Sequence, residues 1–187
     1  MTLDIRGYAI VSDDDKIAAA DGLTPLSLRN EHDWTYYQAA LARADLVVFG
    51  RRSHEAEPNL HGQRRVIVSR DAAGLERRDD GWWWNPQREA WKNVADQLLP
   101  AGGLVAAPGG QVVFDLFLGI GFTEFHLSRA HGVALPGGRG VFSRCETGLR
   151  AETVLEEGGL ALSEVIPLDP ANGVEMNIWR RVGLASG

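Results

Sequence analysis

Runs of apolar residues divide the chain into candidate strands and helices. The segment from Ile5 to Ser12, IRGYAIVS, alternates and then becomes apolar, as a strand does when it passes from an edge into a core. Apolar residues then recur at helical spacing across the segment from Asn30 to Asp45, with Asn30 or Asp33 as the helix cap. The short runs DLVVF and RRVIVSRD are typical of strands that are covered on both faces.

The second half of the chain continues this alternation. Trp82 to Trp84 predict a short strand, and Pro86 predicts the start of a helix that Gly102 or Gly103 ends. LVAAPGG predicts a strand with a glycine turn, QVVFDLFLGIG a helix on that turn, and FTEFHLSRAH a further strand. LPGGRG reads as a structural glycine turn, and two strand-like runs around residues 169–173, DPANG, predict a hairpin.

Strands that alternate with helices and end in a hairpin predict the fold class. We expect a three-layer αβα sandwich, with a mostly parallel sheet and antiparallel strands at one edge. Because no repeat or low-complexity linker interrupts the pattern, residues 1–187 are read as one domain. Parallel sheets bind ligands beyond the carboxyl ends of their strands. Both glycine-bearing turns, after LVVF and after LVAA, are expected there.

Composition narrows the classes of function. The 187 residues include 25 acidic and 19 basic side chains, a formal charge of −6 that disfavours nucleic acid as a partner. No stretch has the ~18 uninterrupted apolar residues of a membrane span. Asp4 and Arg6 stand where a signal peptide needs its apolar run, and Cys145 is the only cysteine, so a cytoplasmic protein without an internal disulfide is expected. The histidines include no pair at ligand spacing, so no metal site is expected.

The turn in FGRRSHE carries residues that suit an anion. Gly50 permits close approach of backbone to a ligand, and Arg51, Arg52 and Ser53 add forked and hydroxyl donors at a helix N-terminus. The alternative, held equal, is a solvated turn with two surface arginines.

Two more strand ends extend this pattern. Gly109 and Gly110 follow a strand and precede a helix, as in many pyrophosphate sites, although a plain tight turn has the same sequence. Ser69 and Arg70 also end a strand and suit an adenosine phosphate. Together the three turns describe a site for a dinucleotide such as NADPH.

These segments resemble the dihydrofolate reductase-like superfamily. VVFGRRSHE is similar to its strand-Gly-Arg-basic-Ser/Thr segment, APGGQVVFDLFLGIGFTEFHLSRAH to its Gly-Gly helix and following strand, and RVIVSRD stands between them, so that the resemblance covers residues 5–142. It implies that fold, NADPH as cofactor, and hydride transfer to a small-molecule substrate, with the nicotinamide near Ala9 and Ile17. The implied cofactor contacts are Ala9, Ile17, Gly50, Arg51, Arg52, Ser53, Ser69, Arg70, Gly109, Gly110, Gln111 and Val112.

Within the superfamily, the chain is most similar to the reductase domain of the bifunctional riboflavin-biosynthesis enzymes. SDDDKIAAADG matches their segment after the first strand at Ser12, Asp14 and Lys16, with Asp13 and Asp15 in place of Leu and Gly. SLRNEHDWTYY lacks the Trp and Pro of the folate reductase pattern. The similarity implies that Lys16 faces the phosphate of a ribosylaminopyrimidine-type substrate. Three consecutive aspartates are expected to repel such an anion.

Lys16, Glu31 and Asp33 are the candidate catalytic residues. Glu31 or Asp33 orients the substrate or relays a proton, unless both only complement the helix dipole. The Trp82–Trp84 cluster lines a site, forms a subunit contact, or belongs to the core with an exposed edge. The riboflavin-type relatives imply a homodimer. The alternative to a reductase is a nucleotide-binding homologue without turnover, and no Gly-x-Ser-x-Gly motif supports a hydrolase.

Overall fold

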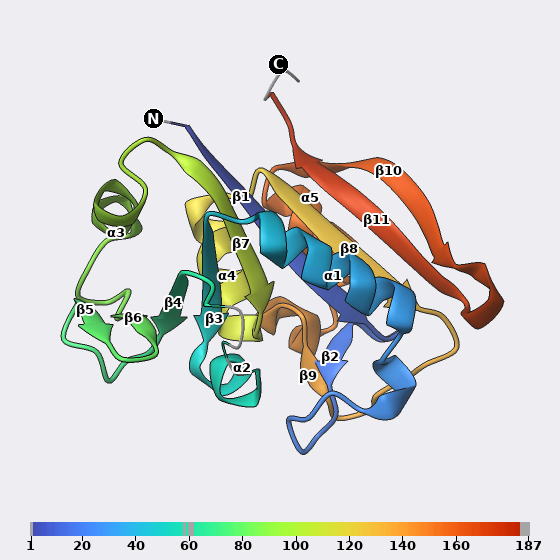
Figure 1. Ribbon diagram of the computed structural model, residues 1–187. Helices are drawn as coiled ribbons and strands as arrows, with labels where there is room; N and C mark the ends of the chain where they lie inside the picture. The colour runs from blue at the N-terminus through green and yellow to red at the C-terminus, as the bar shows by residue number, and fades with distance from the viewer. Residues whose placement is uncertain (1, 58, 60–61, 184–187) are drawn as a thin grey trace.

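The computed structural model describes residues 2–57, 59 and 62–183, and in this part of the chain a nine-stranded sheet lies between two helical layers (Figure 1). The strand order is β10-β11-β8-β1-β7-β3-β4-β6-β5. The strands are β1 (Leu3–Val11), β3 (Leu46–Gly50), β4 (Arg65–Val68), β5 (Leu75–Arg78), β6 (Gly81–Trp84), β7 (Gly103–Gly109), β8 (Glu124–Ala130), β10 (Leu160–Asp169) and β11 (Val174–Arg181). A separate two-stranded sheet pairs β2 (Lys16–Ala18) with β9 (Arg139–Gly140).

The centre of the sheet is parallel, from β8 through β1, β7, β3 and β4 to β6. The predicted C-terminal hairpin is confirmed: β10 and β11 form it, and β11 adds antiparallel to β8 at one edge. The other edge also ends in an antiparallel strand, because β5 pairs with β6. The pattern of LERR did not predict this strand, since it contains one apolar residue among three charged ones.

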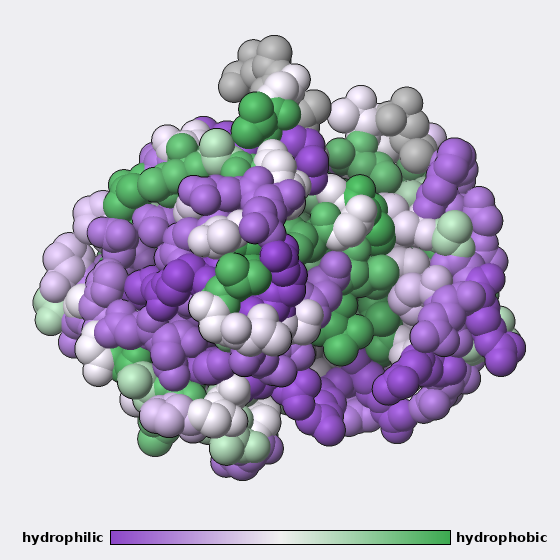
Figure 2. Space-filling model, turned by 180° about the vertical axis from the view of Figure 1, so that it is seen from behind, coloured by the Kyte–Doolittle hydropathy of each residue, from purple (hydrophilic) through white to green (hydrophobic). Residues whose placement is uncertain are grey.

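Helices cover both faces of the sheet. The helical elements are α1 (Glu31–Arg43), α2 (Arg51–Ala56), α3 (Trp91–Leu98), α4 (Gln111–Ile120), α5 (Ala151–Glu157), and the 3-10 turns η1 (Leu26–Leu28), η2 (Ser143–Thr147) and η3 (Pro170–Asn172). α1 crosses one face over β1 and β8, while α4 and α5 lie behind the sheet (Figure 1). The reverse face carries an apolar band at the place of α4 (Figure 2), where Val112 and Ile120 are exposed. No helix of the described residues has the length and apolarity that crossing a membrane requires.

The predicted helix start at Pro86 is wrong, because α3 begins at Trp91. Asn85 starts a single helical turn: its side chain accepts from the N–H of Gln87, and its carbonyl accepts from the N–H groups of Arg88 and Glu89. The backbone of Ala90 is extended, so this turn does not continue, and α3 begins after it.

The two largest parts of the core lie on opposite sides of the sheet. The larger part is rich in aromatic residues: Trp91 of α3 meets Phe117 of α4 edge to face, and Phe114 meets Phe125 of β8 in the same way. The smaller part lies under α1. Trp83 and Trp84 are buried and Trp82 is half-buried, so the tryptophan cluster of β6 serves as core.

The turn that follows β1 is held by a buried ion-pair network. Arg129 of β8, which is 6% exposed, donates to Asp15 Oδ1 at 2.7 Å, to Glu152 Oε1 at 2.5 Å and to the carbonyl of Ser12 at 2.8 Å. Arg150 lies 3.0 Å from Asp15 Oδ2. Among the described residues other than glycine, Asp15 alone has a positive φ, of 60°. Its carboxylate contacts hold a backbone conformation that is unusual for a side-chain-bearing residue.

Protein donors contact all three aspartates of this turn. Asp13 Oδ2 accepts from the N–H of Gly132 at 2.7 Å. Asp14 accepts from the Ser12 hydroxyl at 2.6 Å and from the N–H of Leu135 at 2.9 Å. Asp15 is neutralised by the arginines described above. All three carboxylates thus hold the turn together, and Asp15 is the one that pairs with arginines.

Replacing Arg129 tests the weight of this network. Arg129→Met leaves the buried Asp15 carboxylate with only the half-exposed Arg150, so we expect the free energy of unfolding to fall by about 3 kcal/mol or more. Arg144→Met is the matched control, because Arg144 and its partner Glu157 are both about half exposed; a loss below about 1 kcal/mol is expected. Urea unfolding measures both. Equal losses in the two variants would contradict a special role for Arg129.

Candidate functional site

Two glycine turns meet at the carboxyl edge of the sheet. Phe49, the last residue before Gly50, pairs with Gly109 across β3 and β7. The Ser53 hydroxyl lies 3.5 Å from the position that a Cβ on Gly109 would take, and 3.6 Å from that on Gly110. Gly110 has φ +88° and immediately precedes α4, a conformation that only glycine adopts readily. The turn after β3 and the turn after β7 therefore form one continuous surface, with the first N–H groups of α4 beside it.

A cavity of about 490 Å³ opens at this edge, and three cationic side chains line it. They come from separate elements: Lys16 from β2, Arg52 from α2 and Arg139 from β9. Within the described residues none of the three forms an ion pair. Glu146 also lines the cavity, but it accepts a hydrogen bond from Gln111 Nε2 at 2.7 Å. Asp21 lines the cavity as well and accepts from the N–H of Leu23. Three cations without an ion pair therefore stand against two carboxylates, and the positive balance of the lining favours an anion.

The two arginines of FGRRSHE have different environments. Arg51 donates to Glu55 Oε1 at 2.9 Å and to Asp71 Oδ2 at 2.5 Å, so it joins α2 to the turn that follows β4. Arg52 faces the cavity and lies near Gly22, whose Cβ position would be 3.7 Å from Arg52 Nη1. Arg51 is thus paired with carboxylates, whereas Arg52 lines the cavity.

Asp33 belongs to the first turn of α1, the helix that covers the face of the sheet opposite α4. It is the third residue of α1, is half-buried, and has Ser128 of β8 as a neighbour. Burial raises the pKa of Asp33 above its ordinary value, and the hydrogen bond from Ser128 partly offsets that rise. Ser128 pairs with Ile10, which stands one residue before the end of β1. Asp33 is therefore near the strand end from which the chain turns toward Lys16.

Glu31 is placed differently from Asp33. It is the first residue of α1, is exposed, and borders a second cavity at the helix N-terminus. The two carboxylates of the first turn therefore separate into an exposed one and one against the sheet.

An aromatic surface adjoins Asp33. Trp34 stacks on Tyr37 with ring centres 5.2 Å apart, and 53% of Trp34 is exposed. The Tyr37 hydroxyl donates to Glu57 at 3.0 Å, which ties α1 to the end of α2. Burial, together with the Glu57 carboxylate, raises the pKa of Tyr37 well above its ordinary value. Trp34 thus offers an exposed, flat, apolar surface one residue after Asp33 in α1.

The remaining predicted cofactor residues lie on four elements along the carboxyl edge. Ala9 in β1 and Ile17 in β2 are half-buried. Ser69 is buried, and its hydroxyl accepts from the N–H of Asp71, while Arg70 is exposed in the same turn. That turn is the one that Arg51 reaches.

The side chain of Gln111 is directed away from the glycine turn. Its amide donates to the carbonyl of Gly140 at 3.0 Å, and so supports β9 and Arg139. Val112 is exposed in the first turn of α4.

Sequence reasoning missed Arg139 and Ser128. Arg139 stands in LPGGRG, where a single cation among glycines is the signal that a structural interpretation overlooked. Ser128 is a polar residue in a buried strand, and the sequence does not show that it lies next to Asp33 of α1. In the parts of the chain that the structure describes, no three His, Cys, Asp or Glu side chains are grouped to bind a metal.

The sequence matches no protein-family model and no curated protein. Solved structures match nearly its whole length. Dihydrofolate reductase from Enterococcus faecalis, complexed with NADP(H) and RAB-propyl, has a TM-score of 0.69 at 12% identity, covering 96% of each chain. A pyrimidine reductase-like protein from Corynebacterium diphtheriae has a TM-score of 0.68 at 13% identity, covering 95% of this chain and 91% of its own.

A two-activity protein is also similar. It is the diaminohydroxyphosphoribosylaminopyrimidine deaminase/5-amino-6-(5-phosphoribosylamino)uracil reductase from Thermotoga maritima, with a TM-score of 0.64 at 16% identity over 96% of this chain. This chain spans 56% of that protein's length. At these identities the likeness establishes the fold, which is dihydrofolate reductase-like, and a fold alone does not specify a reaction.

The raised pKa of Asp33 predicts a pH-dependent effect on stability. A carboxylate whose pKa is higher in the folded than in the unfolded protein destabilises the fold when ionised, so stability falls as pH rises through the folded pKa. Asp33→Asn removes the ionised form. We expect this variant to melt above the wild type at neutral pH, with the difference vanishing in acid below the ordinary carboxyl pKa.

Glu31→Gln is the control for this measurement, because Glu31 belongs to the same helical turn but is exposed. Its melting curve is expected to follow the wild type from pH 4 to pH 7, a window that spans ordinary carboxyl titration. An Asp33→Asn variant that is no more stable than the wild type at neutral pH would contradict the buried, ionisable placement of Asp33.

Proposed function

We propose that the protein is an NADPH-dependent reductase that transfers a hydride to a small heterocyclic substrate of the ribosylaminopyrimidine type. The observation that carries the proposal is the cavity of unpaired cations beside the joined glycine turns. A dinucleotide needs a pyrophosphate cradle and, for NADPH, a second phosphate site one nucleoside away. The carboxyl edge of this sheet offers both.

The two adjacent arginines divide the cofactor phosphates between them. Arg52 lines the cavity, and its neighbour Ser53 lies beside Gly109 and Gly110, so we assign Arg52 to the pyrophosphate, together with the first N–H groups of α4. Arg51 reaches the turn that holds Ser69 and Arg70, and this group is assigned to the adenosine phosphate of NADPH. Arg51 exchanges a carboxylate partner for the phosphate when the cofactor binds.

The substrate site lies between the cofactor and α1. NADPH, when bound, supplies the hydride; its nicotinamide is assigned to the region of Ala9 and Ile17. The exposed Trp34 surface suits a flat heterocycle, and Asp33 is placed to hold a ring N–H or to return a proton to the reduced atom. A raised pKa suits this role, because it lets the carboxyl carry a proton nearer to neutral pH.

Lys16 and Arg139 stand on paired strands of the small sheet and face the same cavity as Arg52. We assign this pair to the phosphate of a ribosyl substrate, next to the cofactor pyrophosphate. The proposal concerns a reductase reaction alone. We also propose that the protein forms a homodimer.

Titration with NADPH and NADH, followed by quenching of tryptophan fluorescence, tests the cofactor assignment. Arg52→Ala is expected to weaken both dinucleotides about tenfold or more, because both carry the pyrophosphate. Arg51→Ala is expected to weaken NADPH by a similar factor and to leave NADH nearly unchanged. The two variants control for one another, since they make the same substitution at adjacent positions. Equal losses for NADPH and NADH in the Arg51 variant, or no binding to the wild type, would overturn the assignment.

Turnover separates a reductase from a nucleotide-binding homologue. Loss of NADPH absorbance with a ribosylaminopyrimidine acceptor, abolished by Asp33→Asn while NADPH still binds, is the result expected of the reductase. Tight NADPH binding without oxidation by any pterin or pyrimidine acceptor would instead identify a binding protein of the same fold.

A further inference from the structure

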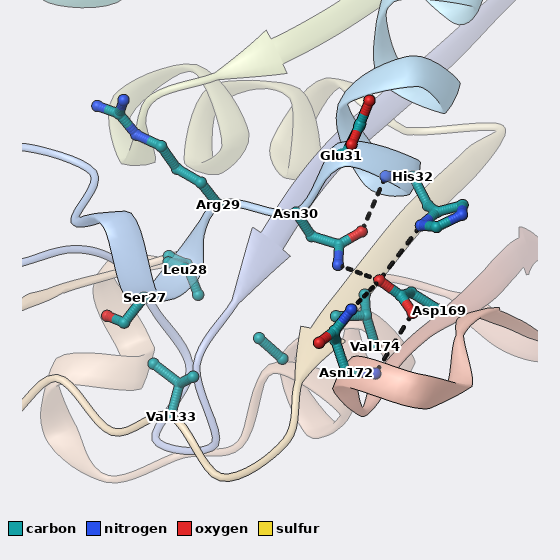
Figure 3. Close-up of a pocket in the computed structure, with 11 residues that line it drawn as sticks. Ser27, Leu28, Arg29, Asn30, Glu31, His32, Val133, Asp169, Asn172 and Val174 are labelled. Carbon is teal, nitrogen blue, oxygen red and sulfur yellow. Dashed lines mark hydrogen bonds and ion pairs between the residues drawn. The ribbon is translucent and has the colours of Figure 1, made fainter.

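One carboxylate ties the N-terminus of α1 to the tip of the C-terminal hairpin (Figure 3). Asp169 is the last residue of β10, and its side chain is 7% exposed. Asp169 Oδ2 accepts from Asn30 Nδ2 at 2.8 Å and from Asn172 Nδ2 at 2.7 Å, and His32 Nδ1 lies 3.2 Å away. Asp169 Oδ1 accepts from the N–H of Asn172. The carboxylate therefore joins segments 139 residues apart in the chain.

Asn30 is the N-cap of α1, and Asp169 determines which way its amide faces. The side-chain oxygen of Asn30 accepts from the N–H groups of His32 at 3.0 Å and Asp33 at 3.1 Å. An amide has one acceptor end and one donor end, so the cap geometry requires the NH₂ group to point away from the helix. The carboxylate of Asp169 accepts from that NH₂ group and would repel the oxygen end. The orientation of the Asn30 amide is thereby fixed, with its oxygen toward the helix and its NH₂ group toward Asp169.

Polar contacts and a small apolar cluster meet at the start of α1. A cavity of about 450 Å³ lies between the first turn of α1 and the hairpin tip, bordered by Asn30, His32, Asp169 and Asn172. Apolar support comes from Leu28, which packs with Ala130 and Val174 before the helix begins. The hydrogen bonds of Asn172 and Asn30 lower the pKa of Asp169 to about 2, so the carboxylate stays ionised wherever the protein is folded near neutral pH.

We propose that Asp169 is a positioning residue for Asp33: through Asn30 it fixes the first turn of α1 and so holds the Asp33 carboxylate against Ser128. The N–H that Asn30 accepts is that of Asp33 itself, so the path from Asp169 to Asp33 has one intermediate residue. A catalytic effect of Asp169 rests on the proposed function. The effect of Asp169 on the position of Asp33 does not. The C-terminal hairpin thus acts on the site of Asp33 indirectly, through Asn30.

The test measures the titration of Asp33 in the full chain by carboxyl ¹³C NMR, with its signal assigned from the loss in Asp33→Asn. Asp169→Asn removes the charge, and Asn30→Ser keeps a good helix cap but loses the donor to Asp169. Each is expected to move the pKa of Asp33 down toward the ordinary value, because burial is the larger cause of its rise. The double variant with Asn30→Asp and Asp169→Asn restores the hydrogen bond with donor and acceptor exchanged, and is expected to restore the wild-type titration.

Asp45→Asn is the matched control. Asp45 also accepts a backbone hydrogen bond, from Leu104, but it precedes β3 at the amino end of the sheet. It is expected to leave the pKa of Asp33 unchanged. An unmoved Asp33 titration in Asp169→Asn, or a double variant no closer to wild type than the single ones, would overturn the proposal. If Asp169→Asn fails to fold, Asn30→Ser and the double variant carry the test.

The readout does not depend on turnover. If the protein binds no NADPH, the titration of Asp33 and its rescue still decide whether Asp169 positions that carboxyl. If the protein is a reductase, kcat/KM is expected to fall about tenfold or more in Asp169→Asn, with NADPH affinity unchanged. A parallel loss of NADPH affinity would indicate a general structural defect and contradict positioning.

Discussion

The buried ion pair between Asp15 and Arg129 is the constraint on which the carboxyl edge of the sheet depends. Arg129 anchors the turn after β1 to β8, and Glu152 joins the same network to α5. The carbonyl of Asp15 accepts from the N–H of Val141, directly after β9. Because β2 and β9 both extend from this turn, the ion pair sets where Lys16 and Arg139 stand. Its partners also hold the positive φ of Asp15, which a glycine would adopt without help.

Charge compensation explains how an acidic chain presents a cationic site. Donors from the protein occupy the carboxylates of the Asp13–Asp15 turn, of Glu146 and of the residues that pair with Arg51. Lys16, Arg52 and Arg139 line a single cavity without such partners. Net charge therefore describes the surface as a whole, whereas the local field follows from which charges the fold has already paired.

Asp33 and Asp169 show how environment separates two chemically identical groups near one helix terminus. Burial raises the pKa of Asp33, whose neighbour is a hydroxyl, and hydrogen bonds from Asn172 and Asn30 lower the pKa of Asp169 to about 2. One carboxyl is thereby suited to exchanging a proton, and the other to serving as a permanent acceptor. The two are linked through Asn30, which donates to Asp169 and accepts from the N–H of Asp33.

Local patterns determined most of the fold. Apolar runs such as LVVF and LVAA, the cap at Asn30 and the glycines around the hairpin act over a few residues, and the resulting strands, helix and turns match the structure. The relation between the two glycine turns also followed, because parallel strands end at one edge. Tertiary structure alone decided the rest: which arginine of FGRRSHE is paired, which carboxylate of the first turn is buried, where α3 starts, and that Arg139 faces the cavity. The partners that settle most of these lie tens to more than a hundred residues away in the chain, and the pattern of neighbouring residues contains no information about them.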